Sequence, residues 1–426
     1  MRVLLIGSRG RTQAIARTLT KNKNVTVYAL MDKLNNGIAD LSFHYEVDDI
    51  ADLDVIDDFV EKNKIEMIVV VSVKTLLKGA VNYFNEIGIP TIGPSALCTW
   101  LEADKGFLRS LMQDNDIEGN PDFMVFFEKE QALDYISQAD FALVVKPAGI
   151  TLQAGVRIEG IHLNDKSQTK AYVEEIFDQN IGNMPCVVLE PKLLGQEYVV
   201  QVLTDGKTVV PFPVVKEFNL LNDPVTVNAP GMGSYSDASH MLPFLDQQSL
   251  DDSLLIIRRI LTALREQYSE NYKGFLSAKF MITHQGIRLL GINVGPDDPA
   301  ALNVLPLLKT DLLEIFRAIA TEGLDEIAVE FEPLATVCKY VVPNESAMTN
   351  SNILIQIDDQ KIADLGINLW QSCFQVQDNV YQPGPRLFAI SATGRSFEEA
   401  YRKCNRGLNC LKCIHTEQHQ KYGKIR

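Results

Sequence analysis

The first side chains able to do chemistry follow an apolar strand at the start of the sequence. The stretch GSRGRTQA comes directly after the apolar run RVLLI and contains Gly7, Gly10 and Arg11. Backbone amides of such a turn, together with the N-terminus of the helix behind it, can bind an anion. The glycine spacing does not fit a dinucleotide fingerprint, and no acidic residue stands where a ribose ligand would be needed. We therefore expect an anion site here and not an NAD site.

Lys146, Glu190 and Glu197 form a second group of candidates. Lys146 ends the apolar run ALVVK directly before a loop, and the two glutamates flank the stretch EPKLLGQE. A lysine at the end of a buried strand needs a partner for its charge, and a phosphate group is such a partner. Each glutamate could bind a ligand, or it could be a solvated charge at the end of a strand.

Composition limits the classes of protein to which the chain can belong. It has 426 residues, of which 46% are hydrophobic and 22% charged, which is typical of a soluble protein with two to four domains. The net charge of -15 disfavours a nucleic-acid partner. No apolar run approaches the roughly 20 residues that span a bilayer, and the N-terminal run is too short for a signal peptide. We expect a cytoplasmic protein with no membrane partner.

The seven cysteines do not suggest a disulfide framework, because their number is odd and their spacing irregular. Cys404, Cys410, Cys413 and His415 lie close together in CNRGLNCLKCIH, which could indicate zinc. There is no second CxxC, however, so buried or free thiols are the favoured interpretation.

The pattern of apolar residues predicts three regions that must position these side chains. Residues 1–97 alternate apolar strands with helices, which indicates a doubly wound parallel sheet. Residues 98–331 contain hairpins that turn at Asp205-Gly206 and at His284 to Gly286, with a lid at about 120–188. Residues 332–426 form a small C-terminal module of short strands and a helix. The predicted fold class combines α/β with α+β.

Five stretches in a fixed order carry a resemblance to a known family. They are LLIGSRGRTQAI, IGPSALCTWLEADKGFLRSLM, LEPKLLGQEYVV, PGMGSYS and GFLSAKFMITHQG with the strand after it. The chain resembles phosphoribosylamine–glycine ligase, a family of the ATP-grasp superfamily, over essentially its whole length. The resemblance implies an ATP-grasp core with a lid and the cofactors ATP and Mg²⁺. It also implies small-molecule substrates, namely glycine or a similar acid and a phosphorylated amine, in a monomer or homodimer.

The same resemblance implies roles for individual residues. The phosphates of ATP would be bound by Lys105 and Lys146, under a loop that keeps Gly149 and Gly155. Glu190 and the backbone of Lys192 and Leu193 would meet the adenine, and Glu197 the ribose or substrate. The catalytic loops would contain Asn228, Gly231, Gly233 and Asp298, and the amine side would contain Gly7, Gly10 and Arg11. Lys105 could instead be a surface lysine of an amphipathic helix, and the two later glycines could serve turn geometry alone.

The sequence departs from the family pattern where a metal would be held. In the stretch LLGINVGPDDPA the position of a magnesium-binding glutamate is Gly291, whereas Asn293 is kept and Asp297 is new. Side chains two apart share a face of a strand, so Asn293 remains as a metal ligand, with Asp297 as a possible replacement for the glutamate. The lid loop also has Gln153 and Ala154 in place of a glycine and a lysine. The amine side has VSV at 71–73 and FNL at 218–220 in place of polar runs.

Two hypotheses of different classes follow from this mixture. The first is an ATP-dependent carboxylate–amine ligase of de novo purine synthesis, or a variant with another amine substrate. The second is a catalytically impaired or inactive relative that binds a nucleotide or a protein partner. An oxidoreductase built on the first domain is a distant third.

Overall fold

The computed structural model describes residues 1–151, 155–218, 231–342, 353–372, 374–377, 380–382 and 386–415. The predictions for Gln153, Ala154 and Asn228 lie outside the described residues, as do Cys373 and the side chains of Cys413 and His415. None of the helices within these ranges is long and apolar enough to cross a membrane.

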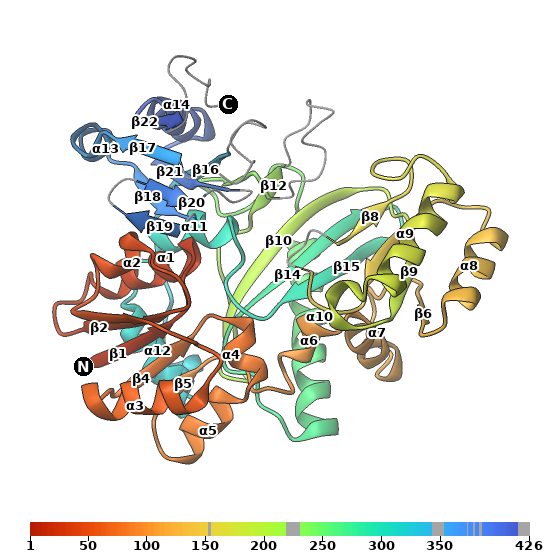
Figure 1. Cartoon of the computed structure of the whole chain (residues 1–426), viewed down its shortest axis with the longest axis horizontal. Helices are drawn as coiled ribbons and strands as arrows, with labels where there is room; N and C mark the ends of the chain where they lie inside the picture. The colour runs from red at the N-terminus through yellow and green to blue at the C-terminus, as the bar shows by residue number, and fades with distance from the viewer. Residues whose placement is uncertain are drawn as a thin grey trace.

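The N-terminal region is a parallel five-stranded sheet of order β3-β2-β1-β4-β5, which confirms the doubly wound prediction (Figure 1). The inner strands β1, β2 and β4 are buried on both faces, because helices cover both sides, whereas the edge strand β3 exposes alternate residues. The strands are β1 (Arg2–Ile6), β2 (Thr26–Met31), β3 (His44–Val47), β4 (Met67–Val70) and β5 (Thr91–Ile92). The helices are α1 (Gly10–Leu19), α2 (Asn36–Ala39), α3 (Leu53–Asn63), α4 (Val73–Leu77) and α5 (Ala80–Glu86).

Two predicted helices are each broken in two. The stretch LLKGAVNYFNEIG is divided at Gly79, whose φ of 81° ends α4 and begins α5. The stretch from residue 101 to 117 is divided at Asp104, between α6 (Trp100–Ala103) and α7 (Lys105–Asp114). The carboxylate of Asp104 accepts the amides of Gly106 and Phe107, a side-chain N-cap that competes with helix continuation. Lys105 is therefore the first residue of a helix rather than a residue in the middle of one.

An antiparallel core sheet follows, with the order β11-β10-β14-β15. It contains both predicted hairpins, and Gly206 has the positive φ of 94° that its turn requires. Helix α10 (Gln247–Tyr268) packs on one face, where the hydroxyls of Tyr198 and Ser253 lie 2.7 Å apart. The strands are β10 (Gln196–Thr204), β11 (Val209–Pro211), β14 (Gly274–Thr283) and β15 (Gly286–Asn293).

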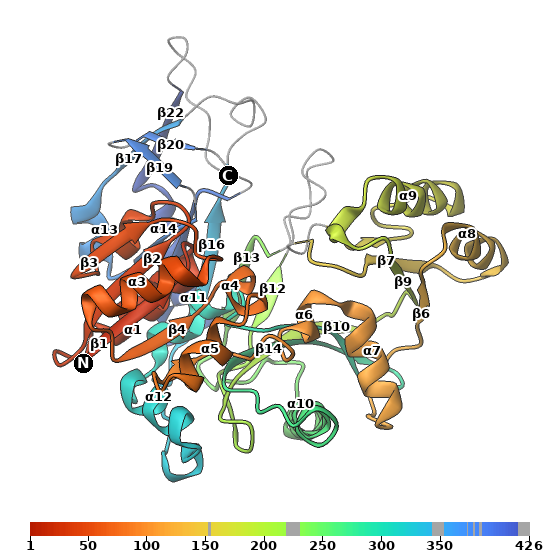
Figure 2. The same ribbon diagram turned by 60° about the horizontal axis from the view of Figure 1, so that its bottom comes forward.

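The predicted lid is a separate antiparallel sheet, of order β6-β9-β7-β8, with its own small apolar core. Figure 2 shows that it projects away from the N-terminal sheet. Glu190 of β9 contacts Arg109 of α7, and Lys146 of β7 contacts the carbonyl of Leu290 in the core sheet. Its elements are β6 (Met124–Phe126), α8 (Lys129–Gln138), β7 (Leu143–Pro147), β8 (Arg157–Ile158), α9 (Lys166–Asp178), η1 (Ile181–Asn183) and β9 (Val187–Pro191).

The C-terminal strands build a sheet of order β12-β13-β16-β21-β18 that also includes earlier residues. Its first two strands are β12 (Lys216–Phe218) and β13 (Gly233–Ser236), which lie before the predicted boundary at residue 332. The others are β16 (Ala335–Val341), β18 (Asn368–Gln371) and β21 (Phe388–Gly394). A smaller sheet contains β17 (Ile353–Ile357), β19 (Phe374–Gln377), β20 (Val380–Gln382) and β22 (Leu411–His415). The described helices of this C-terminal region are α13 (Asp359–Leu365) and α14 (Phe397–Leu408).

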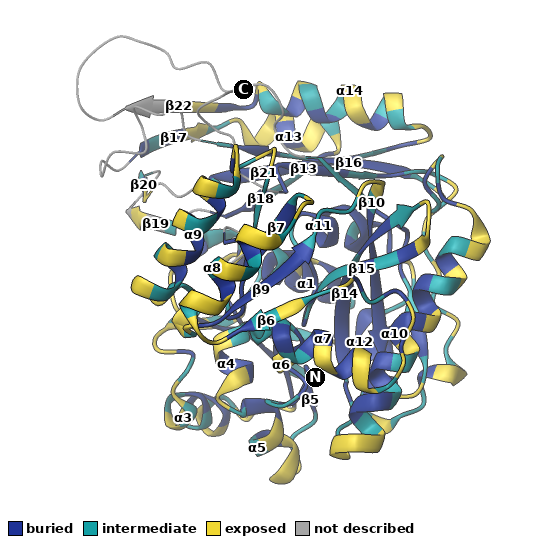
Figure 3. Cartoon of the chain, turned by 90° about the vertical axis from the view of Figure 1, so that its right-hand side faces the viewer, coloured by how far each residue is buried: buried dark blue, intermediate teal, exposed yellow. Residues whose placement is uncertain are grey.

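The buried residues lie mainly along the strands, whereas the outer helices expose one face to solvent (Figure 3). One large apolar cluster runs from the N-terminal sheet to the face of the core sheet covered by α10. A second covers the opposite side and includes the linking helices. These are α11 (Ala300–Val304), η2 (Leu305–Leu307), α12 (Leu312–Thr321) and η3 (Leu324–Glu326). Because the cores are continuous, the N-terminal sheet and the core sheet are packed against each other directly.

The side chain of Asp205 is buried behind the β10–β11 turn and accepts hydrogen bonds from its backbone. Removing this side chain therefore tests how much the turn contributes to stability. Its carboxylate is fully buried and accepts the amides of Lys207 (3.0 Å), Thr208 (2.7 Å) and Leu324 (3.1 Å). We expect Asp205→Ala to lower the free energy of unfolding by about 3 kcal/mol, because the buried Leu324 amide loses a charged acceptor. Urea denaturation measures this change.

The control is Asp251→Ala on the exposed face of α10, which should cost less than about 0.5 kcal/mol. A loss at Asp205 no larger than that of the control would contradict the structural importance of this turn.

Candidate active site

Three charged side chains meet where the lid joins the core sheet. The carboxylate of Glu190 on β9 accepts Arg109 Nε at 2.8 Å and Lys146 Nζ at 2.7 Å. All three residues are nearly inaccessible, at 2% exposure for Arg109, 7% for Lys146 and 3% for Glu190. Charges at this depth are tolerated only when they are paired and hydrogen-bonded. Glu190 is therefore a partner for the buried charge of Lys146.

A β-bulge in the core hairpin completes this cluster. Between β14 and β15 the register shifts, so that Lys279 pairs with Gly291 and Phe280 with Leu289. Leu290 is the extra residue, and a bulged residue is left out of the ladder. Its carbonyl accepts both Lys146 Nζ and Arg109 Nη2, each at 3.0 Å. The bulge thus binds the lid strand and α7 to the same point of the core sheet.

Lys105 lies beside this cluster, on the other side of the end of β7. Its Nζ donates to the carbonyls of Pro147 (2.9 Å) and Gly149 (2.7 Å), at the start of the predicted phosphate loop. Burial, and next the charge of Lys146, lower the pKa of Lys105 to about 8. The structure therefore brings the two predicted phosphate-binding lysines together at one end of one strand.

Burial also lowers the pKa of Lys146 to about 8, although Glu190 acts in the opposite direction. Burial would raise the pKa of Glu190, but Arg109 and Lys146 outweigh it and leave that pKa lowered. Because Arg109 also contacts Glu190, this glutamate can stay ionised although the pKa of its other partner, Lys146, is lowered. The sequence analysis did not single out Arg109, since one arginine on an amphipathic helix carries no sign that it points inward.

The glycines of the lid loop fit their places for steric reasons. A Cβ on Gly149 would collide with the carbonyl of Gly182, and a Cβ on Gly155 would lie 2.6 Å from Thr151 Oγ1. The hydroxyl of Tyr172 donates to the carbonyl of Gly155. Both glycines therefore have a packing reason within the chain itself, and their contact with a ligand stays a prediction.

The stretch from Glu190 to Glu197 runs along the entrance of the site. The amide of Lys192 donates to Ala142 at 2.8 Å, so it is already used within the lid. The adenine contacts predicted for Lys192 and Leu193 stay predictions. Glu197 is the second residue of β10, and its carboxylate pairs with Lys279 Nζ at 3.0 Å.

The side chains at the predicted metal position are bonded to other groups of the protein. Lys279 Nζ lies 3.0 Å from Glu197 and 3.5 Å from Glu217, whose side chain is 8% exposed. Asn293 donates its side-chain amide to Asp297 at 2.9 Å, so both predicted metal ligands are bound to each other. Within the described ranges, no group of three or more acidic, histidine or cysteine side chains could hold a metal ion. This donor set does not fit a magnesium ion held by the protein, because magnesium needs several oxygen ligands at about 2.0–2.1 Å.

Two of these acids are held in a strongly perturbed environment. Burial, and next the charge of Asp297, raise the pKa of Glu217 to about 7, against the opposing effect of Lys279. Burial likewise raises the pKa of Asp297. Among the described residues, Oε1 of Glu217 has no hydrogen-bond partner. The sequence analysis missed Glu217, which lies in a short strand, and Lys279, although a lysine within the apolar run FLSAKFMI was a usable signal.

Asp298 faces the C-terminal sheet rather than the lysines. Its carboxylate accepts the hydroxyl of Tyr340, and Arg386 Nη1 lies 3.7 Å away. A Cβ on Gly231, whose φ is 65°, would lie 2.8 Å from Arg386, so the glycine turn packs on the same group. Gly233 lies in β13, where a Cβ would collide with the ring of Phe218. The catalytic roles predicted for Asp298, Gly231 and Gly233 stay predictions, and the close neighbours of the two glycines belong to the chain itself.

The predicted anion site lies directly after β1, in the N-terminal sheet. Gly7 has a φ of 150°, and a Cβ there would lie 2.7 Å from Thr12 Oγ1. Gly10 begins α1. Arg11 reaches across to the loop after β15, with Nη1 3.3 Å from the carbonyl of Pro296 and Nη2 3.4 Å from that of Val71.

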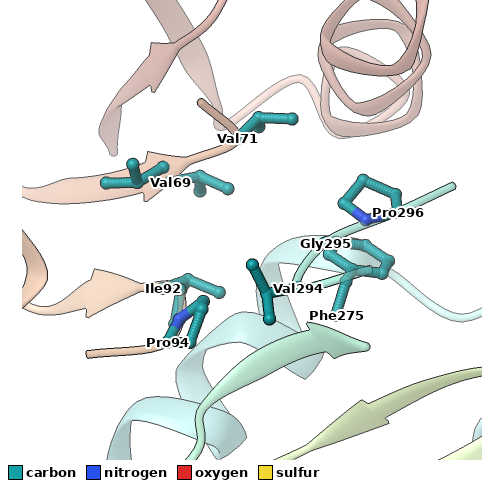
Figure 4. A pocket seen from close by; sticks show the side chains of 10 residues that line it. Val69, Val71, Ile92, Pro94, Phe275, Val294, Gly295 and Pro296 are labelled. Carbon is teal, nitrogen blue, oxygen red and sulfur yellow. The ribbon is translucent and has the colours of Figure 1, made fainter. Parts of the chain in front are cut away.

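A small cavity opens next to this arginine, between the N-terminal sheet and the core sheet (Figure 4). Figure 4 shows Val69, Val71 and Ile92 on one side, facing Phe275 and Val294 on the other. Its ten lining residues are 69–71, 92–94, 275 and 294–296, and none of them is charged. Glu102, which the sequence analysis missed, lies nearby and accepts the amide of Val294 at 2.7 Å.

Glu190→Gln tests the buried cluster by removing the charge that both cations share. We expect a loss of about 3–5 kcal/mol in the free energy of unfolding, because two buried cations would keep only a neutral acceptor. Urea denaturation at pH 7 gives the value. The matched control is Lys129→Met in the exposed pair with Asp178, which should leave the free energy of unfolding nearly unchanged. Equal losses in the two variants would show that the cluster does not hold the lid to the core.

Comparison with known proteins agrees with this arrangement along the whole chain. Residues 1–102 match the family model of the phosphoribosylglycinamide synthetase N domain, and residues 103–301 match that of its ATP-grasp (A) domain. Phosphoribosylamine–glycine ligase of Methanobrevibacter smithii is 35% identical over 97% of this chain and 94% of its own length. That of Methanococcus maripaludis is 36% identical, with the same coverage.

Solved structures share the fold at lower identity. Phosphoribosylamine–glycine ligase from Thermotoga maritima superposes with a TM-score of 0.77 at 20% identity, covering 97% of this chain and 98% of that one. The biotin carboxylase domain of 2-oxoglutarate carboxylase from Hydrogenobacter thermophilus gives 0.72 at 12% identity, covering 97% and 90%. On the family models and the sequence relatives together, the chain belongs to the phosphoribosylamine–glycine ligase family.

Proposed function

We propose that this protein is an ATP-dependent ligase that joins the carboxylate of glycine to the amine of 5-phosphoribosylamine. The observation that carries the proposal is the placement of Lys105 and Lys146 at the end of β7, between the lid and the core sheet. Two adjacent lysines of lowered pKa are suited to a polyanion, which supplies the charge that Glu190 only partly offsets. Family membership supports the choice of ATP as that polyanion and of glycine as the acid.

In the proposed reaction the terminal phosphoryl group of ATP moves to a carboxylate oxygen of glycine, and ADP leaves. The amine nitrogen then attacks the acyl carbon, the bond to the phosphate oxygen breaks, and phosphate departs with those electrons. Lys105 and Lys146 would hold the phosphates of ATP in line with the acid. The carbonyl of Lys192 and the amide of Leu193 would orient the adenine at the lid exit.

A second candidate is a ligase of the same type with a less charged amine. The cavity beside Arg11 favours it, because its lining is apolar and that guanidinium lies against two backbone carbonyls. A phosphate group bound there would find one arginine and the turn at Gly7 to Gly10, whereas phosphate sites commonly use several charged donors.

The direct test follows ADP release from ATP with glycine and freshly made phosphoribosylamine. We expect turnover that requires both substrates, and a fall of at least about 100-fold in Lys146→Met, which corresponds to about 2.7 kcal/mol. Lys129→Met on lid helix α8 should keep normal rates. Turnover only with an uncharged amine would select the second candidate. A rise in melting temperature with ATP, but no ADP with any amine, would contradict ligase activity and leave a nucleotide-binding protein.

Affinity for ATP should also fall as the pH rises through 8. Below pH 8 both lysines are charged, and above it they lose protons that ATP binding would have to restore. We expect the dissociation constant for ATP to be at least about tenfold larger at pH 9.5 than at pH 7, which means weaker binding at the higher pH. The charged groups that face the lysines are Arg109, Glu190, Glu102, Asp104 and Glu197.

Calorimetric titration with ATP at the two pH values measures this effect. Lys105→Arg keeps its charge at both, so it should show a flatter profile than the unchanged protein. A profile in the unchanged protein that is level from pH 7 to 9.5 would mean that neither lysine meets the nucleotide.

A further inference from the structure

The face of the core sheet turned away from α10 carries charged and polar side chains next to apolar residues such as Val199 and Leu203. On β10 and β14 the residues Tyr198, Val200, Ala278 and Phe280 point into the apolar core with α10. Alternate residues of a strand point to the opposite face, so Glu197 and Lys279 lie together on the other side. Their contact at 3.0 Å is the result. Glu217, from the strand before the glycine turn, reaches the same ammonium at 3.5 Å.

The register places this lysine directly opposite the glycine that breaks the metal motif. Lys279 pairs with Gly291, and the next pair on the same face is Ser277 with Asn293. Side chains of directly opposed residues share the same space above the sheet. A Cβ on Gly291 would meet nothing within 4 Å, so that space is open beside the strand. Gly291, which lacks a carboxylate, and Lys279, which adds a cation, therefore lie opposite each other on neighbouring strands.

We propose that the ammonium group of Lys279 takes the place of a protein-bound divalent cation on this face of the sheet. It neutralises Glu197 and Glu217 directly, and its charge also acts on Asp297. An ammonium donates up to three hydrogen bonds at about 2.7–2.9 Å, which suits carboxylates spaced more widely than magnesium tolerates. A lysine cation is permanent, so the carboxylates would be held in place before any ligand arrives.

The arrangement makes a prediction about metal binding that needs no nucleotide and no catalysis. With Lys279 present, a second cation at this point would meet like-charge repulsion. Removing the lysine would leave Glu197 and Glu217 facing each other without a counterion, which is the state that attracts a divalent cation. Adding a carboxylate at residue 291 would supply a further ligand from the opposite strand. Metal binding at Lys279 can therefore be tested independently of the proposed ligase activity.

Titration of the nucleotide-free protein with Mn²⁺, followed by electron paramagnetic resonance, tests this proposal. We compare the unchanged protein with Gly291→Glu, Lys279→Ala and the double variant Lys279→Ala with Gly291→Glu. We expect only weak, surface-type binding in the first two. A new site should arise in Lys279→Ala, and binding at least about tenfold tighter than in the unchanged protein should arise in the double variant.

Lys309→Ala is the matched control, because it removes an exposed lysine paired with the single carboxylate of Glu330 and should create no site. Tight Mn²⁺ binding by the unchanged protein that Glu197→Gln abolishes would overturn the proposal. So would Mn²⁺ binding in folded Lys279→Ala no tighter than in Lys309→Ala. If Lys279→Ala does not fold, Gly291→Glu decides: a new tight site formed with Lys279 still present would refute the replacement.

Discussion

The buried contact of Arg109 and Lys146 with Glu190 is the interaction on which the rest of the site depends. It joins helix α7, the lid strands β7 and β9 and, through the carbonyl of Leu290, the core hairpin. A carboxylate held by two cations stays ionised when one of them is drawn to another anion, because the other remains. Arg109 thereby allows Lys146 to serve a ligand without leaving Glu190 as an isolated buried charge, which would be costly.

The charged groups of the site are arranged in two clusters with different chemistry. Around the end of β7, Arg109 and Lys146 share Glu190, and Lys105 lies beside them, with Glu102 and Asp104 also nearby. On the core sheet, Glu197, Glu217 and Asp297 surround Lys279. The lysines of the first cluster are suited to a polyanion, whereas the charges of the second already offset one another.

The surroundings of Arg11 are apolar, in contrast to the two charged clusters. Val69 and Val70 of β4, Val71 directly after it and the turn after β15 line a cavity without a charged side chain, and Arg11 contacts backbone carbonyls of Val71 and Pro296. Packing of this kind joins the N-terminal sheet to the core sheet through apolar contact.

The sequence by itself determined the elements and the family. Apolar runs bounded by turns predicted the parallel sheet, the two hairpins and the lid, because those patterns depend only on local spacing. The order of the motifs pointed to the family, whereas the altered metal site inferred from Gly291 stays a prediction. Local pattern failed at Gly79 and Asp104, where one backbone angle and one capping side chain divided helices that their composition would continue.

Only the tertiary structure decided which charges meet. Arg109, Glu217 and Arg386 come from a helix, a short strand and a late loop, and nothing in their neighbours along the chain marks them as parts of a site. The bulge at Leu290 and the opposition of Lys279 to Gly291 depend on strand register, which no single strand specifies. Electrostatic partners are chosen by distance in space and by burial, whereas the sequence records only distance along the chain.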